Sequence, residues 1–84
     1  MSERKLHIRI VSPKGVLFDG EADKVTLPGA EGKFMVLPRH APIISALVEG
    51  EVVYSAEGVE ESVAIAGGFA DVKDDTVTVA VEVA

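Results

Sequence analysis

The residues best placed to do chemistry lie in the segment Pro38–Pro42, which reads PRHAP and holds one of only two histidines in the chain. If His40 acted as a general base, it would need a nucleophile and an orienting acid. The serines of the chain lie in no recognisable nucleophile motif. Proline on both sides fixes the backbone of the segment, which indicates a rigid loop displayed for contact. We therefore expect a binding module without catalytic residues, and a small hydrolase or ligand-binding sandwich that uses His40 is the competing hypothesis.

A metal site requires several ligands that converge. His7, the other histidine, occupies a polar position in an alternating segment, and neither HxH nor HExxH spacing occurs. Asp71, Asp74 and Asp75 lie close together around one predicted hairpin. Turns favour aspartate for local backbone hydrogen bonds, and the spacing of an EF-hand calcium loop is absent. The sequence therefore predicts no metal and no cofactor.

The segment Gly29–Phe34, GAEGKF, has a superficial likeness to a phosphate-binding loop. That motif needs four residues between its glycines and Ser or Thr after its lysine. Here Ala30 and Glu31 separate the glycines, and Phe34 follows Lys33. The segment also leads into a predicted strand, so the helix N-terminus that would hold a phosphate is missing.

The elements that position these residues are predicted to be strands. Fourteen valines and alternating apolar residues at Leu6–Ile10 and Val77–Val83 are typical of half-buried strands. Ile43–Val48 also fits one face of a helix, but its short length favours a strand. About nine strands are predicted in all: Leu6–Ile10, Val16–Phe18, Ala22–Leu27, Lys33–Leu37, Ile43–Val48, a strand beginning with Val52 and Tyr54, Ser62–Ala66, Phe69–Lys73 and Val77–Val83.

Turn signals separate these strands. They lie at Ser12–Gly15, Asp19-Gly20, Pro28-Gly29, Glu57-Gly58 and Asp74-Asp75. A turn or a β-bulge is expected at the glycine pair 67–68. Many short strands with turns between them predict an all-β sandwich or barrel-like sandwich, which forms a single domain over residues 1–84.

Composition excludes several classes of protein. The chain has 84 residues, no cysteine and a formal net charge of −6. Disulfide frameworks and thiolate metal sites are therefore impossible. The negative charge argues against binding to nucleic acid or to an anionic membrane surface. No segment approaches the ~20 apolar residues of a membrane helix, so we expect no direct membrane insertion.

An ordered set of motifs resembles one family over essentially the whole chain. It comprises Val11–Gly15 (VSPKG), Leu17–Gly20 (LFDG), Val25–Gly32 (VTLPGAEG), Leu37–Ile44 (LPRHAPII), Gly67–Phe69 (GGF) and Val77–Val79 (VTV). Each piece is weak alone, but their order is specific. In this combination the sequence resembles the epsilon subunit of the F-type, proton-translocating rotary ATP synthase.

This resemblance implies a ten-stranded antiparallel β-sandwich. It also implies a non-catalytic rotor subunit of the central stalk that binds the gamma subunit and the ring of c subunits. Such a subunit helps to couple proton-driven rotation to ATP synthesis, as a peripheral protein at the cytoplasmic face of the bacterial inner membrane. A generic β-sandwich adaptor that kept the motifs but binds another partner is the alternative.

The resemblance also implies two sets of contact residues. The family's contact with the c ring maps onto Glu31, Gly32, Lys33, Arg39, His40, Ala41 and Pro42. The contact with gamma is expected at His40, Ala41, Pro42, Ile43, Gly67, Gly68 and Phe69.

Two departures from the family pattern are informative. The family often has an acidic residue in place of Lys33, and glycines in place of Met35 and Arg39. We therefore expect a ring loop with compensating acids, or a contact that depends less on polar pairing.

Most members also continue into a C-terminal helical hairpin, whereas the last predicted strand here ends almost at Ala84. The expectation is a chain without inhibitory helices and without their ATP site.

Overall fold

A computed structural model, which describes residues 4–84, contains eight strands and no helix. The predicted all-β fold class is confirmed, and the segment that also fitted a helix is a strand. The strands are β1 Leu6–Ser12, β2 Gly15–Ala22, β3 Lys24–Gly29, β4 Gly32–Val36, β5 Ile43–Leu47, β6 Gly50–Ala56, β7 Val59–Lys73 and β8 Thr76–Val83.

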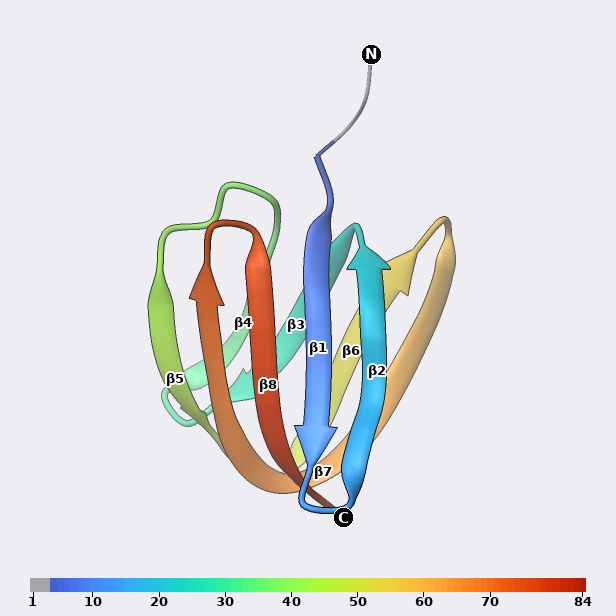
Figure 1. Cartoon of the computed structure of the whole chain (residues 1–84). Helices are drawn as coiled ribbons and strands as arrows, with labels where there is room; N and C mark the ends of the chain where they lie inside the picture. Colours follow the sequence, from blue (N-terminus) through green and yellow to red (C-terminus); the bar gives the residue numbers. More distant parts are fainter. Residues whose placement is uncertain (1–3) are drawn as a thin grey trace.

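The strands form two layers, seen face-on in Figure 1. The front layer contains β5, the second half of β7, β8, β1 and β2, and the back layer contains β4, β3, β6 and the first half of β7. The 15-residue strand β7 belongs to both layers, because it pairs with β6 through residues 59–65 and then with β5 and β8. The bend in β7 therefore crosses from one layer to the other at one end of the sandwich, at the bottom of Figure 1.

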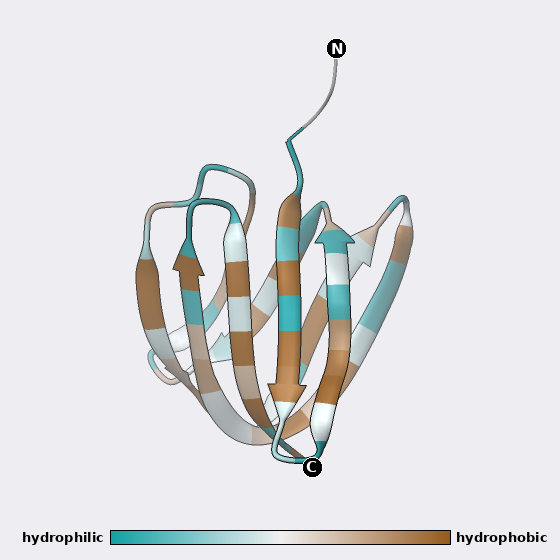
Figure 2. Ribbon diagram, viewed as in Figure 1, coloured by the Kyte–Doolittle hydropathy of each residue, from teal (hydrophilic) through white to brown (hydrophobic). Residues whose placement is uncertain are grey.

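The core lies between the layers and follows the predicted alternation. Leu6, Ile8 and Ile10 of β1 are fully buried, and their polar neighbours His7 and Arg9 are exposed. Figure 2 shows this alternation as bands along β1 and β8. Between the layers, the rings of Phe18 and Tyr54 pack with centroids 4.3 Å apart. Burial of the apolar face of every strand drives the two layers together.

The strand count is lower than the nine read from the sequence and the ten implied by the resemblance. Ser62–Ala66 and Phe69–Lys73, predicted as two strands, are both parts of β7. The register of β7 against β8 shifts between Ile65 and Gly67, so the expected bulge is confirmed and the alternative of a turn is wrong. A bulge bends a strand without ending it, which lets one strand serve both layers.

Two predicted turns are also wrong. Asp19 and Gly20 lie inside β2, paired with Arg9 and Ile8 of β1. The ring of Phe18 covers Gly20, where an added Cβ would lie 3.1 Å from the ring. Gly20 thus leaves room for the Phe18 ring within a strand. The hydrogen-bonded pairing of β2 with β1 outweighs the local turn propensity of Asp19-Gly20.

The predicted turn at Pro28-Gly29 lies two residues later, at Ala30 and Glu31. Pro28 remains in β3 because only its carbonyl oxygen, and no N–H donor, is needed for pairing at this position. Its carbonyl oxygen accepts a hydrogen bond of 2.9 Å from the N–H of Val48. A proline is tolerated in a strand where no donor is required.

The turns at Ser12–Gly15, Glu57-Gly58 and Asp74-Asp75 are confirmed. Asp74 and Asp75 have φ of 52° and 62°, the left-handed values that a two-residue hairpin turn needs.

The sandwich was expected to be purely antiparallel, and this expectation is wrong for one pair of strands. β1 and β8 pair in parallel, with Ile8 opposite Val77 and Ile10 opposite Val79. The rest of the domain separates these two strands in sequence, so no short hairpin constrains their direction.

Candidate functional site

The Pro38–Pro42 loop connects β4 to β5 and is held by specific hydrogen bonds. The backbone N–H of His40 donates to the carbonyl oxygen of Leu37 over 3.1 Å. Nδ1 of His40 lies 2.6 Å from the carbonyl oxygen of Ala41. A carbonyl can only accept, so this contact requires a hydrogen on Nδ1. Nδ1 is therefore occupied by a structural bond within the loop.

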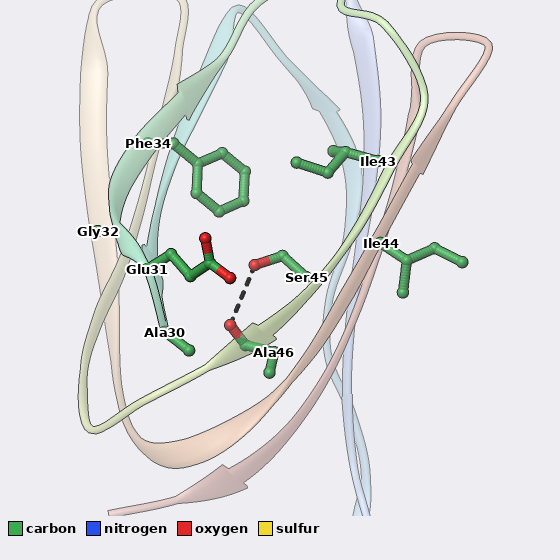
Figure 3. Close-up of a pocket in the computed structure, with 8 residues that line it drawn as sticks. All are labelled: Ala30, Glu31, Gly32, Phe34, Ile43, Ile44, Ser45 and Ala46. Carbon is green, nitrogen blue, oxygen red and sulfur yellow. Dashed lines mark hydrogen bonds between the residues drawn. The ribbon is translucent and has the colours of Figure 1, made fainter.

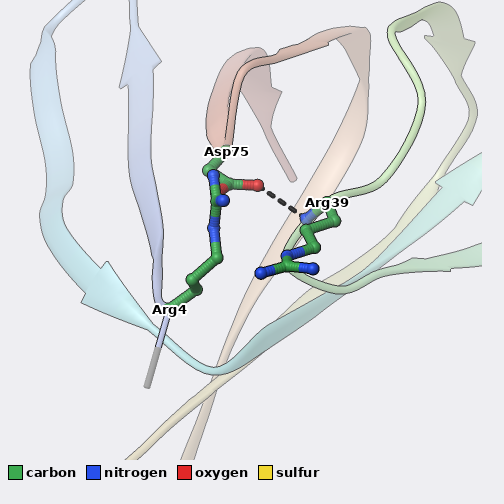
Figure 4. Close-up of polar contacts among 3 residues, drawn as sticks. All are labelled: Arg4, Arg39 and Asp75. Carbon is green, nitrogen blue, oxygen red and sulfur yellow. Dashed lines mark hydrogen bonds and ion pairs between the residues drawn. The ribbon is translucent and has the colours of Figure 1, made fainter. Parts of the chain in front are cut away.

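The loop is also attached to the β7–β8 hairpin through Asp75 (Figure 4). The backbone N–H of Arg39 donates to Oδ1 of Asp75 over 2.6 Å, and Nε of Arg4 donates to Oδ2 over 2.8 Å. The N–H of Arg39 and then the guanidinium of Arg4 hold the pKa of Asp75 below its ordinary value. One member of the predicted aspartate cluster is thus a loop anchor, and its ionised form is the one these contacts stabilise.

Arg39 adopts φ of 72°, a left-handed conformation that favours glycine. Glycine would adopt this conformation without strain. Arg39 is held there by the bond from its N–H to Asp75. Its side chain is exposed, so it places a positive charge on the loop.

The residues predicted to contact the c ring do not form one cluster. Glu31–Lys33 lie at the β3–β4 turn, whereas Arg39–Pro42 lie beyond the opposite end of β4 (Figure 1). A strand of five residues spans about 16 Å at ~3.3 Å per residue. Both segments are largely exposed on the side of the sandwich where β4 and β5 are the outermost strands. Their role in ring binding stays a prediction.

The residues predicted to contact gamma are also divided. Phe69 is 63% exposed on the outer face of the front layer, whereas His40–Pro42 belong to the loop at its end. The strand register places Phe69 beside Ala46 of β5 and Ala80 of β8, and Ala80 beside Val11 of β1. We call these four residues the Phe69 row. They form an apolar line across four neighbouring strands.

A polar line lies next to the Phe69 row. At two residues from the row on β7, β8 and β1, the register aligns Asp71, Thr78 and Arg9, and Asp19 of β2 lies beside Arg9. The residue beside Asp71 on β5 is Ile44, which is apolar and 77% exposed. The motif GGF pointed to Phe69 but not to Val11, Ala46 or Ala80. The alternation of apolar and polar residues within each strand indicated only that these side chains could point outward. The lateral register between strands was required to show that they lie side by side.

A cleft of about 370 Å³ lies between β4 and β5 (Figure 3). Glu31 and Phe34 line one side and Ile43 and Ser45 line the other. Figure 3 shows the Glu31 carboxylate directed across the cleft toward Ser45. The cleft connects part of the predicted ring segment with Ile43 of the predicted gamma segment.

The remaining chemical candidates take structural positions. Within residues 4–84, no three His, Cys, Asp or Glu side chains gather closely enough to hold a metal ion. His7 contacts the carboxylate of Asp19 over 2.7 Å on the exposed face of the front layer. The hydroxyl of Ser45 donates to the carbonyl oxygen of Ala46 over 3.0 Å. No helix in this part of the chain is long and apolar enough to span a membrane.

These features define a class of protein: a small β-sandwich domain with an apolar outer row, a basic exposed loop and one open side. Comparison with known proteins gives the family. The family model for the ATP synthase delta/epsilon chain β-sandwich domain matches residues 5–84, so the chain belongs to this family. The predicted resemblance is thereby confirmed.

Relatives carry the same assignment in their names. The chain is 45% identical over 80 residues to the ATP synthase epsilon chain of Nitratidesulfovibrio vulgaris (strain DP4), which covers 95% of this chain and 60% of the relative. It is 42% identical over 77 residues to the epsilon chain of Desulfitobacterium hafniense (strain Y51), which covers 92% and 58%. The chain thus spans about three-fifths of the length of these relatives.

Solved structures share the fold. A chain of the Euglena gracilis mitochondrial ATP synthase (OSCP/F1/c-ring, rotational state 1) matches with a TM-score of 0.87 and 21% identity, over 96% of this chain and 52% of that one. A chain of the Tetrahymena thermophila mitochondrial ATP synthase central stalk and c-ring matches with a TM-score of 0.79 and 15% identity, over 98% and 66%. At these identities the similarity concerns the fold alone.

Proposed function

We propose that this chain is the β-sandwich of a non-catalytic epsilon-type subunit in the central stalk of an F-type ATP synthase. In this role it binds the gamma subunit and the c ring and helps to couple proton-driven rotation to ATP synthesis. It works at the cytoplasmic face of the bacterial inner membrane as a peripheral protein. The observation that carries the proposal is the 45% identity to an epsilon chain over 95% of this sequence.

The Phe69 row is the proposed centre of the gamma contact. An exposed phenylalanine flanked by alanines offers a large apolar side chain on a flat surface, and buried aromatic residues commonly dominate binding energy. Ile44, next to the row, adds a second exposed apolar side chain. The polar line behind them supplies the rim that protein interfaces usually have.

Lys33 and Arg39 are the proposed polar contacts with the c ring. They carry positive charge at the two ends of β4, on a chain whose formal net charge is −6. An acidic loop on the ring would pair with both charges. If Lys33→Glu and Arg39→Glu each assemble with the ring as well as the native chain does, the ionic contact is wrong.

Mechanical coupling requires a subunit that does not yield under torque. The two layers share β7, and 11 of the largest apolar side chains are fully buried between them. A close-packed interior of this kind has low compressibility, so force applied at the ring contact is transmitted to the gamma contact. The sandwich thus acts as a rigid spacer between two binding surfaces.

Co-purification with the gamma subunit of the same organism tests the proposal. The variant Phe69→Asp places a charge at the centre of the row, and we expect gamma binding to weaken at least ~30-fold, as for loss of an interface hot spot. Ser62→Asp is the matched control, because Ser62 is an exposed residue of the same strand in the other layer. Failure of the native chain to bind gamma would instead favour the adaptor function with another partner.

A further inference from the structure

One lateral side of the sandwich, where β4 and β5 are the outermost strands, is open (Figure 1). β4 is the last strand of the back layer and pairs only with β3. β5 is the last strand of the front layer and meets β3 only at the pair Leu47 and Gly29. The cleft lined by Glu31 and Phe34 lies between these two edges (Figure 3).

Register determines which backbone groups of β4 are free. Gly29 of β3 lies opposite Gly32 of β4, and its neighbours Pro28 and Ala30 form hydrogen bonds on the other side, to Val48 just after β5 and to Ala46 of β5. Alternation therefore directs Gly29 and Leu27 toward β4, where they exchange hydrogen bonds with Gly32 and Phe34. The residues between them on β4 must then point their backbone groups away from the sheet.

Those residues are Lys33 and Met35. Each presents one N–H donor and one C=O acceptor along the outer edge of β4, and both side chains are exposed. On β5 the carbonyl oxygen of Ala46 accepts a hydrogen bond from the N–H of Ala30. By the same alternation, the backbone N–H and C=O of Ile44, two residues earlier, point toward the opening. An added strand would find donors and acceptors at the regular spacing of a sheet.

The side chains of the cleft indicate what that strand carries. Phe34 and Ile43 form apolar walls, and Glu31 is the one charged residue among those that line the cleft. Alternate residues of an added strand point to the same side, about 6.6 Å apart. A basic side chain at one inward position would meet Glu31, and an apolar side chain at the next would lie between Phe34 and Ile43.

We propose that the open edge of β4 binds an extended segment of a partner protein by β-strand addition, with a basic and then an apolar side chain inserted into the cleft. This goes beyond the proposed function, since it concerns the backbone edge of β4, whereas the Phe69 row lies on the outer face of the front layer and meets the cleft only at Ala46. A second copy of the chain is disfavoured as the occupant, because each copy carries a net charge of −6.

The test uses the isolated chain and a blocked peptide of sequence Thr-Lys-Thr-Val-Thr-Val-Thr. Backbone NMR should show chemical-shift changes and slowed hydrogen exchange at the amides of Lys33 and Met35. Met35→Pro removes one edge donor, and proline is tolerated where the N–H faces solvent. We expect this variant to keep its fold and to bind the peptide at least ~10-fold more weakly, whereas Met35→Thr, which retains the N–H, binds within about twofold of the native chain.

Charge is tested with Glu31→Gln and with a peptide in which Glu replaces Lys. The native chain should prefer the Lys peptide several-fold, and Glu31→Gln should abolish that preference. The proposal is overturned if Met35→Pro binds as the native chain does, or if the peptide shifts map to β2 or to the Phe69 row. It is also overturned if the Lys33 and Met35 amides become protected with rising chain concentration and the peptide does not compete. Gamma binding by Met35→Pro reports separately on the proposed function.

Discussion

The backbone N–H of Arg39 donates a 2.6 Å hydrogen bond to Oδ1 of Asp75, which lies 36 residues farther along the chain. This bond connects the β4–β5 loop to the β7–β8 hairpin, and Arg4 binds the other carboxylate oxygen from the start of the chain (Figure 4). One side chain thereby holds together three segments that are distant in sequence. The bond from Arg39 to Asp75 is one of the hydrogen bonds that hold the Pro38–Pro42 loop, together with those of His40 to Leu37 and to Ala41.

Replacing Asp75 should release this loop. Asp75→Ala removes the acceptor for the Arg39 N–H, and we expect hydrogen exchange at that amide to accelerate roughly five- to tenfold. Asp75→Asn keeps an acceptor oxygen and tolerates φ of 62°, so its effect should be smaller. Hydrogen exchange followed by NMR measures both. Equal exchange rates in the native chain and in Asp75→Ala would show that the prolines and the hydrogen bonds of His40 hold the loop without Asp75.

The left-handed conformation of Arg39 gives a second prediction. Arg39→Gly removes the backbone strain of the left-handed conformation, but it also raises the conformational entropy of the unfolded chain. Because these two effects oppose each other, we expect the free energy of unfolding to change by less than about 1 kcal/mol. Arg39→Val places a β-branched residue at φ of 72° and should cost about 1–3 kcal/mol. Urea denaturation of the two variants measures the difference. If both are equally stable, the loop does not hold φ at this value in solution.

Stability should fall in acid through Asp75 and Asp23. Hydrogen bonds from the Arg39 N–H and from Arg4 lower the pKa of Asp75 below 3.8, and Lys5 with the Glu57 N–H lowers that of Asp23. The unfolded chain therefore binds protons at higher pH than the native chain does. The stabilisation is complete above the unfolded pKa and is lost as the pH falls through the lowered native values.

Urea denaturation between pH 6 and pH 2 checks this dependence. Asp75→Asn and Asp23→Asn should each reduce the loss of stability in acid, and the double variant should reduce it most. Asp74→Asn is the control, since its side chain makes no hydrogen bond or ion pair within residues 4–84. A control that flattened the acid dependence as much as Asp75→Asn does would contradict the assignment.

Gly68 permits the close approach of β7 and β8 beside Phe69. It has φ of 154°, and an added Cβ would lie 2.1 Å from the carbonyl oxygen of Ala80. Gly68→Ala should therefore destabilise the chain by about 3 kcal/mol or more, because two backbones must separate. Gly67→Ala is the matched control, with an added Cβ at 3.5 Å from its nearest contact, and should cost about 1 kcal/mol or less. Thermal or urea unfolding that gave the two variants equal stability would contradict the predicted close contact.

The sequence by itself determined the periodic features. Alternation over Leu6–Ile10 and Val77–Val81 predicted buried and exposed faces correctly, because in a strand the side-chain period depends only on local geometry. At the end of the last strand the alternation fails, since Val83 is exposed. Asp74-Asp75 predicted a tight hairpin for the same reason, since both residues tolerate left-handed φ. The ordered motifs were sufficient to identify the family.

Tertiary structure decided how those elements lie beside one another. Asp19-Gly20 became part of β2 because pairing with β1 outweighed a local turn signal. The bulge before Gly67 merged two predicted strands into one that serves both layers. The Phe69 row, the bond from Arg39 to Asp75 and the open edge of β4 all depend on lateral register between distant segments. Local residue patterns carry little information about such register, because any strand with one apolar face can satisfy the same core from several neighbouring positions.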